Sequence, residues 1–149
     1  LPYPDDSIKA VFASHLLEHM SLREAEFLIE EIYRVLQSRG RIRVIVPDLY
    51  RFAKEYVEEV TKEPSSRAND LFLERLNSFY IEPYPLIKKI LSHKKHLYMY
   101  DRWTLAEILR EKCFKEVKEM MYGESGIKGL DGVERKGRYK NGFCLEAVK

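Results

Sequence analysis

Two histidines and a glutamate stand close together in residues 15–19, His-Leu-Leu-Glu-His. This order matches the H-x-x-E-H pattern of inverted zinc peptidases, in which the histidines hold zinc and the glutamate activates water. That chemistry needs both histidines on one face of a long helix. An apolar, strand-like run ends at Ser14 and a new helix starts at Ser21, which leaves little room for such a helix. A zinc peptidase is therefore kept only as an alternative, and we expect no metal site.

Glycines gather near the C-terminus, where Gly126, Gly129 and Gly132 stand three residues apart. A glycine-rich loop that holds a phosphate or a cofactor follows a strand and opens a helix. No such pattern surrounds these glycines. We interpret residues 123–141 as a long, flexible hairpin loop.

The elements that must position these residues alternate between strand and helix. A buried strand is predicted for residues 8–14, and a capping box of Ser21 and Glu24 starts the next helix. We expect Glu30 and Arg34 to pair on its wet side and Gly40 to follow its end with a positive φ. A second strand over residues 41–46 stops at Pro47, after which Asp48 can cap another helix. This order is the signature of an α/β fold.

The second part of the chain is less regular. Residues 61–100 form a helical insert, with helices expected at 69–80 and 86–91. A capping box of Thr104 and Glu107 opens a further helix, in which Trp103 is expected to be core. Residues 117–122 and 143–148 are predicted strands. Arg41 and Arg43 alternate along a strand, so they mark a partly open face or pair with glutamates of the first helix.

Composition excludes several classes of protein. A length of 149 residues predicts one domain, and no apolar run is long enough to cross a membrane. The 26 basic and 24 acidic residues give a net charge of +2, so no general attraction to nucleic acid is expected. Cys113 and Cys144 lie far apart, which favours free thiols and a cytoplasmic location.

Taken in order, these segments resemble the C-terminal half of the class I S-adenosylmethionine-dependent methyltransferases, in the branch that acts on small molecules. The segments that carry the resemblance are the loop 1–7, the strand and "LEH" turn 10–19, the helix end 33–36 with 40–42, and the later pieces 47–49, 100–101, 113–114 and 144–147. The family's Lys-Pro-Gly is replaced here by Gln37-Ser38-Arg39.

The resemblance implies a Rossmann-like sheet with strands in the order four, five, seven, six, flanked by helices, with residues 143–148 as an antiparallel strand seven. It implies S-adenosylmethionine as cofactor, passed closely by Ser14, His15 and Leu16. His19 stands where some members approach the transferred methyl group. Because an imidazole titrates near neutrality, His19 could take a proton from an acceptor hydroxyl. The alternative is that His19 only caps or packs the turn before Ser21.

The acceptor is implied to be a small or sugar-like molecule. Members often bind it with inserts after strand five, which points to Asp48, His96, Tyr98 and Tyr100. The alternative for residues 93–100 is a solvated basic turn whose tyrosines pack on the sheet.

Two parts of the family's cofactor site would lie before Leu1: the glycine-rich turn after strand one and the acidic residue ending strand two. We therefore expect one partial domain over residues 1–149. An unpaired edge of strand four would invite a homodimer near residues 11–14. A half-domain without catalysis, which dimerises or is completed by a partner, is the main alternative to an enzyme.

Overall fold

The computed structural model describes residues 1–62, 66–76 and 96–149 and contains a four-stranded sheet. The strands are β1 (Ile8–Ser14), β2 (Leu36–Pro47), β3 (Lys115–Glu119) and β4 (Gly142–Val148). Their order is β1-β2-β4-β3; β1 runs parallel to β2, whereas β4 is antiparallel to both of its neighbours. The predicted strand order and the antiparallel last strand are confirmed.

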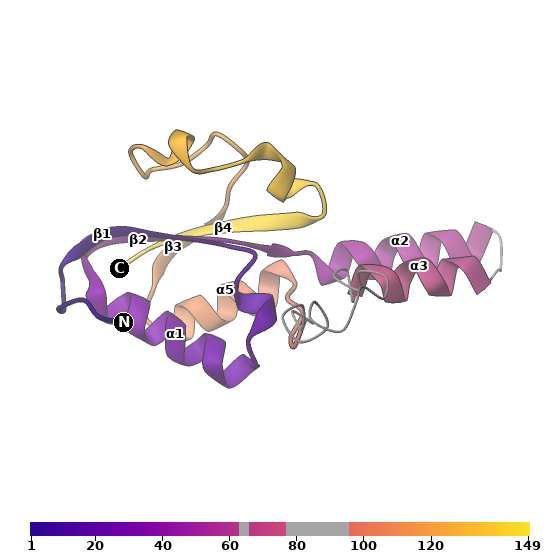
Figure 1. Ribbon diagram of the computed structural model, residues 1–149, viewed down its shortest axis with the longest axis horizontal. Coiled ribbons are helices and arrows are strands. Elements are labelled where there is room, and N and C mark those ends of the chain that lie inside the picture. Colours follow the sequence, from indigo (N-terminus) through magenta and orange to yellow (C-terminus); the bar gives the residue numbers. More distant parts are fainter. Residues whose placement is uncertain (63–65, 77–95) are drawn as a thin grey trace, which may run out of the picture.

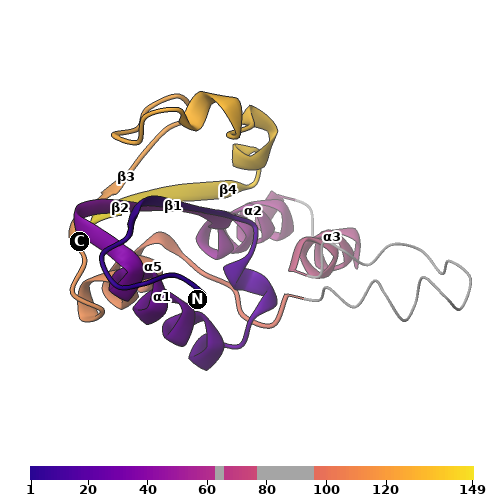
Figure 2. The ribbon, with the colours of Figure 1, turned by 60° about the vertical axis from the view of Figure 1, so that its left-hand side comes forward.

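The two faces of the sheet are covered differently. Helices α1 (Leu22–Val35) and α5 (Arg102–Glu111) lie on one face, and the segment between β3 and β4 lies on the other (Figure 1). The view in Figure 2 agrees with this layering. The segment contains two short 3₁₀ helices, Leu130–Gly132 and Lys136–Tyr139. Residues 123–141 thus form a cover over the sheet, although their predicted flexibility stays a prediction.

Helices α2 (Leu49–Lys62) and α3 (Ser66–Leu76) form a pair that extends beyond the carboxyl end of β2 (Figure 1). Asp48 caps α2 as predicted, because its Oδ1 accepts the N–H of Arg51 at 3.3 Å. The two helices are joined by Tyr56 and Phe72, whose ring centroids are 4.8 Å apart. Helix α3 covers most of the predicted helix 69–80, whereas the predicted helix 86–91 lies outside the described residues.

The core lies between the sheet and the α1–α5 layer. Its fully buried members include Ile29, Leu36, Ile42, Val44, Leu105 and Leu109. Helix α1 begins with the predicted capping box, in which Ser21 and Glu24 satisfy each other's backbone N–H groups. Tyr33 of α1 packs edge-on against Phe114 after α5, at 5.1 Å between centroids. The segment before α5 is tied to the end of β2 by the N–H of Leu49, which donates to Tyr100 O at 2.9 Å.

Two predicted helix ends are wrong. Helix α5 begins one turn earlier than expected, because Asp101 accepts the N–H groups of Trp103 and Thr104 and is its N-cap. At this cap, Asp101 offers a carboxylate to two N–H groups at once, which outcompetes the Thr104 hydroxyl. Helix α1 runs directly into β2, and the residue with positive φ is Arg39, at 63°, instead of Gly40.

Two further predictions, one of a contact and one of burial, are also wrong. Glu30 pairs with Lys112 of the α5 end at 2.5 Å, and Arg34 instead contacts Glu31 with both its Nε and a terminal nitrogen at 2.8 Å. Trp103 is 59% exposed rather than core, and lies edge-on to Tyr50. It stands in the first turn of α5, on the side away from the core.

Arg43 lies fully buried beneath the 123–141 cover, and its predicted partners are also wrong. Its Nε donates to Glu134 at 2.7 Å and a terminal nitrogen donates to Glu146 at 3.1 Å, so it pairs with the cover and β4 instead of α1. Arg41 joins the same carboxylate of Glu146 at 3.1 Å. Tyr139 donates to Glu134 and accepts from Arg43. The cover is therefore fixed to the sheet by a buried ionic network.

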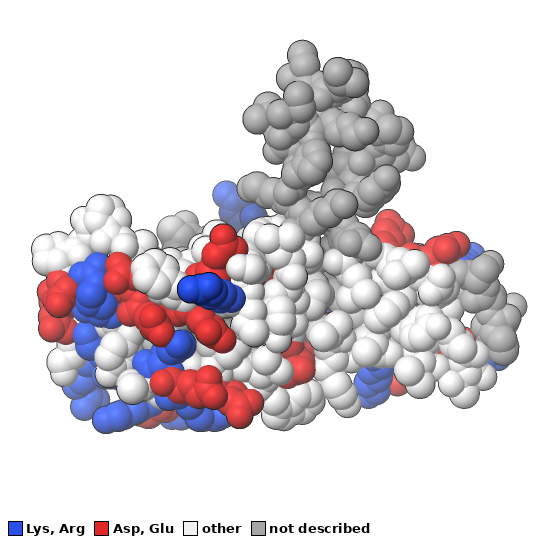
Figure 3. All heavy atoms as spheres, turned by 90° about the horizontal axis from the view of Figure 1, so that it is seen from below, with Lys and Arg blue, Asp and Glu red and all other residues white. Residues whose placement is uncertain are grey.

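The outer surface of the α1–α5 layer carries charges of both signs. In Figure 3, blue and red residues alternate over the half that holds these helices, whereas the half over α2 and α3 is mainly uncharged. Such intermixed charges give no basic surface of the kind nucleic acid requires. Among the described residues, no helix is both long and apolar enough to cross a membrane.

Candidate functional site

The carboxyl ends of the parallel strands β1 and β2 meet at one edge of the sheet. In open α/β sheets, ligands bind outside the carboxyl ends of such strands. Here β1 ends at Ser14, and the chain turns through His15 and Leu16 into a 3₁₀ helix, Leu17–His19. The residues with candidate chemistry at 15–19 therefore stand where the fold places ligands.

His15 has a φ of 53°, which turns the chain sharply away from the strand. Its backbone N–H still donates to Ile45 O at 2.8 Å, so the turn remains anchored to β2. The ring lies between two acceptors, with Nδ1 3.1 Å from Glu18 Oε1 and Nε2 3.0 Å from Arg138 O. The Glu18 carboxylate raises the pKa of His15 against the opposing effect of burial, and the Arg138 carbonyl adds to the rise. A ring held by two acceptors favours its doubly protonated form.

Glu18 is completely buried, although it carries a carboxylate. Its Oε1 faces His15, whereas its Oε2 has no hydrogen-bond partner among the described residues. Its backbone carbonyl accepts the N–H groups of Leu97 at 2.7 Å and Tyr98 at 3.4 Å. This contact fastens the segment before α5 to the turn after β1.

That fastening brings His96 next to His19, with 5.3 Å between the ring centroids. One donor atom from each of Glu18, His19 and His96 lies within 4.8 Å of the others. Burial lowers the pKa of His96, with Glu18 acting against this effect and the neighbouring His19 ring in the same direction. His96 is thus held in its neutral form near pH 7, as a metal ligand or a hydrogen-bonding group.

A hollow of about 240 Å³ opens beside these residues. It is lined by His15, Pro47, Phe52, Arg75, His96 and residues 137, 138, 140 and 141. Small-molecule pockets commonly have volumes of roughly 300–1,000 Å³. The hollow therefore suits part of a small ligand.

The first 44 residues match the family model described as "Methyltransferase domain". A possible histamine N-methyltransferase from Thermotoga maritima superposes with a TM-score of 0.54 at 16% identity, over 100% of this chain and 59% of that one. A SAM-dependent methyltransferase from Archaeoglobus fulgidus gives 0.52 at 15% identity, over 99% and 62%. The chain has the class I methyltransferase fold. The resemblance predicted from the sequence is thereby confirmed.

The chain spans less than two thirds of the length of these two structures. A third, the Burkholderia thailandensis 1,6-didemethyltoxoflavin-N1-methyltransferase, has bound 1,6-didemethyltoxoflavin and S-adenosylhomocysteine; its TM-score is 0.50 at 15% identity, over 97% of this chain and 45% of that one. No curated protein matches the sequence.

In this fold, the three residues expected at the cofactor, Ser14, His15 and Leu16, follow one another at the carboxyl end of β1. The Ser14 hydroxyl is buried and has no hydrogen-bond partner among the described residues. Leu16 is 45% exposed. An unpartnered buried hydroxyl next to an exposed apolar side chain is consistent with a ligand surface.

The residues expected at the acceptor separate into two groups. His96 lines the hollow, and Tyr98 stands edge-on to Tyr100 with 4.9 Å between centroids. Tyr100 is fully buried, and burial raises the pKa of its hydroxyl, which has no hydrogen-bond partner among the described residues. Asp48 is also buried, but its oxygens are engaged by the N–H of Arg51 and by Arg102 at 2.9 Å. Its contacts account for a structural role.

Sequence reasoning missed Glu18 and Arg138 as members of this site. Glu18 was considered only as part of the peptidase pattern, and that geometry is absent because His15 lies outside the 3₁₀ helix that carries His19. The signal that could have identified Glu18 is an acidic residue soon after the end of a buried strand. Arg138 gave no signal, because it contacts His15 across 123 residues through its backbone carbonyl.

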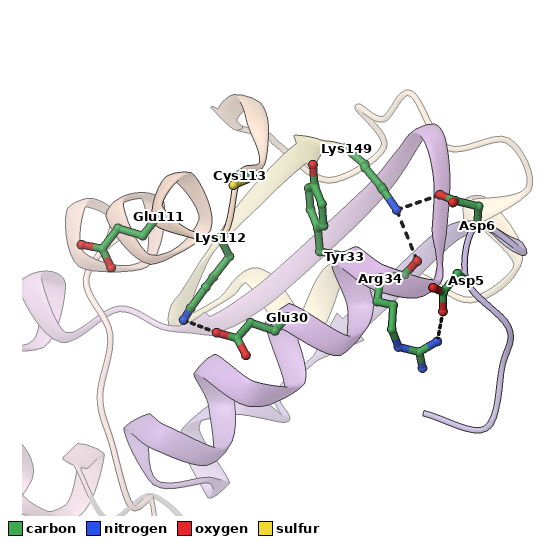
Figure 4. Close-up of a pocket in the computed structure, with 9 residues that line it drawn as sticks. All are labelled: Asp5, Asp6, Glu30, Tyr33, Arg34, Glu111, Lys112, Cys113 and Lys149. Carbon is green, nitrogen blue, oxygen red and sulfur yellow. Dashed lines mark hydrogen bonds and ion pairs between the residues drawn. The ribbon is translucent and has the colours of Figure 1, made fainter.

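A larger hollow lies at the opposite end of the strands, as Figure 4 shows, and it is not part of this site. It is bordered by the residues that precede β1 and by the end of β4. Six of its seven charged side chains are paired: Arg34 with Asp5 at 2.5 Å, Lys149 with Asp6 at 2.8 Å, and Lys112 with Glu30. Amino ends of parallel strands are not where this fold binds ligands.

Proposed function

We propose that this chain forms one wall of the active site of an S-adenosylmethionine-dependent methyltransferase that acts on a small molecule. The observation that carries the proposal is the group of buried polar side chains at the carboxyl ends of β1 and β2. The Ser14 and Tyr100 hydroxyls have no hydrogen-bond partners among the described residues, and Glu18 adds a buried carboxylate that faces His15. Buried polar atoms are rarely left unpaired unless a ligand, an ion or water meets them.

The residues present fit one side of the cofactor. Ser14, His15 and Leu16 offer a hydroxyl, a sharply turned backbone and an exposed apolar side chain. When bound, S-adenosylmethionine supplies a methyl group that bonds to the acceptor atom as its bond to sulfur breaks, with the electron pair left on sulfur and the acceptor proton lost to a base. The glycine-rich turn and the ribose carboxylate of the family are not found in residues 1–149, and we propose that they belong to a part of the protein outside this sequence.

The chain's own residues would act on the acceptor. We propose that His19 accepts its proton and that His96, which lines the hollow, contacts it together with Tyr98. Tyr100 and Asp48 would support these residues. The small hollow favours a small-molecule acceptor, and the net charge of +2 gives no general attraction to nucleic acid. Alignment of acceptor and methyl donor would supply much of the rate.

The free edge of β1 favours a second candidate. Strand β1 pairs only with β2, so its other edge is unpaired among the described residues. A half-domain that is completed there by a second copy, as a homodimer, or by other strands would explain the edge. In that candidate the chain has a structural role and binds no cofactor by itself.

Calorimetric titration with S-adenosylhomocysteine distinguishes the two candidates. We expect weak binding, and at least about tenfold weaker binding for Leu16→Arg, which blocks the wall at an exposed position and so spares the fold. Val57→Arg makes the same change at a position of 59% exposure on α2 and should bind like the unchanged chain. A folded chain that shows no binding at about millimolar ligand, a level that detects even weak sites, contradicts the proposal and favours the half-domain.

A further inference from the structure

Three metal-ligand side chains converge at the turn after β1. We infer that Glu18, His19 and His96 together bind one divalent first-row transition metal ion, for which Zn²⁺ is the best-fitting candidate. One donor atom of each lies within 4.8 Å of the others. Among the described residues this is the single group of three or more ligand side chains that is arranged in this way.

The distances are close to those a bound ion requires. With metal–ligand bonds of about 2.1 Å, two ligands of a tetrahedral ion stand roughly 3.4 Å apart. His19 Nε2 lies 3.9 Å from Glu18 Oε1, and the two imidazole centroids are 5.3 Å apart with planes inclined by 51°. Small rotations of the two rings would bring all three donors onto one ion.

The backbone holds the three ligands together although they come from segments almost 80 residues apart. The N–H groups of Leu97 and Tyr98 both reach the carbonyl of Glu18. Leu97, which donates at 2.7 Å, directly follows His96 in the chain. The acceptor, Glu18, directly precedes His19. The site is thus fixed by the fold and does not depend on long, free side chains.

Glu18 gives a second reason to expect a metal ion, because its buried carboxylate faces only the His15 and His19 rings among the ion pairs of the described residues. Its side chain has no exposed surface, and its Oε2 has no hydrogen-bond partner among the described residues. A buried carboxylate is costly unless a positive charge or hydrogen bonds compensate it. His15 lies 3.1 Å from Oε1, but a carboxylate offers about four lone-pair positions, so a metal ion can share it.

The ligand types favour one class of metal. Two imidazoles and one carboxylate are a common set for Zn²⁺ and also suit Fe²⁺, whereas Mg²⁺ and Ca²⁺ prefer oxygen ligands. Three protein ligands leave at least one position open, as in catalytic rather than structural zinc sites. This arrangement differs from the inverted-peptidase pattern, because Glu18 is a ligand and His15 is not.

The place of the open position connects the metal to the proposed function, on which this part of the inference rests. His96 also lines the hollow in which the acceptor would lie. A metal ion there would bind an acceptor oxygen and lower its pKa, which aids loss of its proton. His19 would then be a ligand instead of a base, and a metal site would replace our expectation of none.

Zinc content tests the inference directly. The background carries Cys113→Ser, because this exposed thiol could bind zinc by itself. After loading with Zn²⁺ and dialysis, we expect one zinc per chain by mass spectrometry, and a visible absorption band when Co²⁺ replaces it. His19→Gln and His96→Gln should each weaken binding by more than about tenfold, the least that even an outer partner of a metal ligand costs.

Glu18→Gln keeps the volume of the side chain and should also lose the metal, whereas Glu107→Gln on α5 makes the same change away from the site. Near-ultraviolet circular dichroism identifies any variant that fails to fold. Substoichiometric zinc in the background chain, or unchanged zinc in folded His19→Gln and His96→Gln chains, overturns the inference. Titration with S-adenosylhomocysteine tests the proposed function separately. Cofactor binding without zinc binding contradicts only the metal site, and zinc binding without cofactor binding contradicts only the proposed function.

Discussion

The Nε of Arg43 donates to Glu134 Oε1 at 2.7 Å, across 91 residues and with both side chains almost fully buried. This ion pair connects the central strand β2 to the segment that covers the sheet. Because that segment also carries Arg138, whose carbonyl contacts His15, the pair helps to position one wall of the hollow.

Loss of the Glu134 charge should therefore destabilise the fold. For Glu134→Gln we expect the free energy of unfolding to fall by about 3 kcal/mol, since the buried Arg43 loses one of its compensating negative charges. Glu116→Gln, at an exposed carboxylate of β3, should change it by less than about 0.5 kcal/mol. Urea unfolding followed by circular dichroism measures both, and equal effects would show that the buried pair is not special.

The same network predicts how stability depends on pH. Burial opposes ionisation of Glu134 and Glu146, but their hydrogen bonds outweigh this effect and lower both pKa values below 4.5. Tyr139 and Arg43 donate to Glu134. Ser125, Gly126 and Arg43 donate to Glu146. A carboxyl group whose pKa is lowered by folding stabilises the fold at pH values above its unfolded-state pKa. This stabilisation is lost as the pH falls through the folded-state pKa. The stability difference between the unchanged chain and Glu134→Gln should thus shrink between about pH 5 and pH 3. A difference that stays constant over this range would contradict the assignment.

Gly142 should resist substitution for a reason of space. A Cβ there would lie 2.6 Å from the carbonyl oxygen of Val46, a backbone atom of β2 that cannot move aside cheaply. We expect Gly142→Ala to cost about 1–3 kcal/mol, as overpacking does. Gly132→Ala meets nothing within 4 Å and is the matched control. Thermal unfolding compares the two, and an equally stable Gly142→Ala chain would mean that β2 and β4 can separate there.

Pairing at the free edge of β1 can be tested with one proline. The N–H of His15 points to β2, so by alternation that of Ala10 points to the free edge. Ala10→Pro then removes an outward donor while sparing the β1–β2 bonds. If two copies pair at this edge, sedimentation should give twice 17.7 kDa for the unchanged chain and for Ala10→Ser, and 17.7 kDa for Ala10→Pro. A monomeric unchanged chain would rule out the homodimer.

Much of the fold was predictable because its signals are local. The capping box of Ser21 and Glu24, the apolar run before Ser14 and the alternation of strand and helix depend on neighbours in sequence, and the strand order followed from the family resemblance. The ends of α1 and α5 were mispredicted because competing caps, such as Asp101 against Thr104, differ little in sequence.

The site was predictable only in part. The turn at 15–19 was found because its residue types are unusual together. Its long-range contacts were not, since the proximity of His96 to His19 and the contact of Arg138 with His15 arise from folding across many residues. Arg43 shows the same limit, because nothing in its strand indicates that its partners are Glu134 and Glu146.

The most direct test of the central claim is residue-resolved nuclear magnetic resonance of the ¹⁵N-labelled chain during titration with S-adenosylhomocysteine. This measurement detects weak binding and shows where it occurs. We predict progressive shifts of the Ser14, His15, Leu16 and His19 amides, with little change around Tyr33, Lys112 and Lys149 at the opposite hollow. Unchanged amides at residues 14–19, or shifts confined to the opposite hollow, would contradict the proposal that the turn after β1 is a wall of the cofactor site.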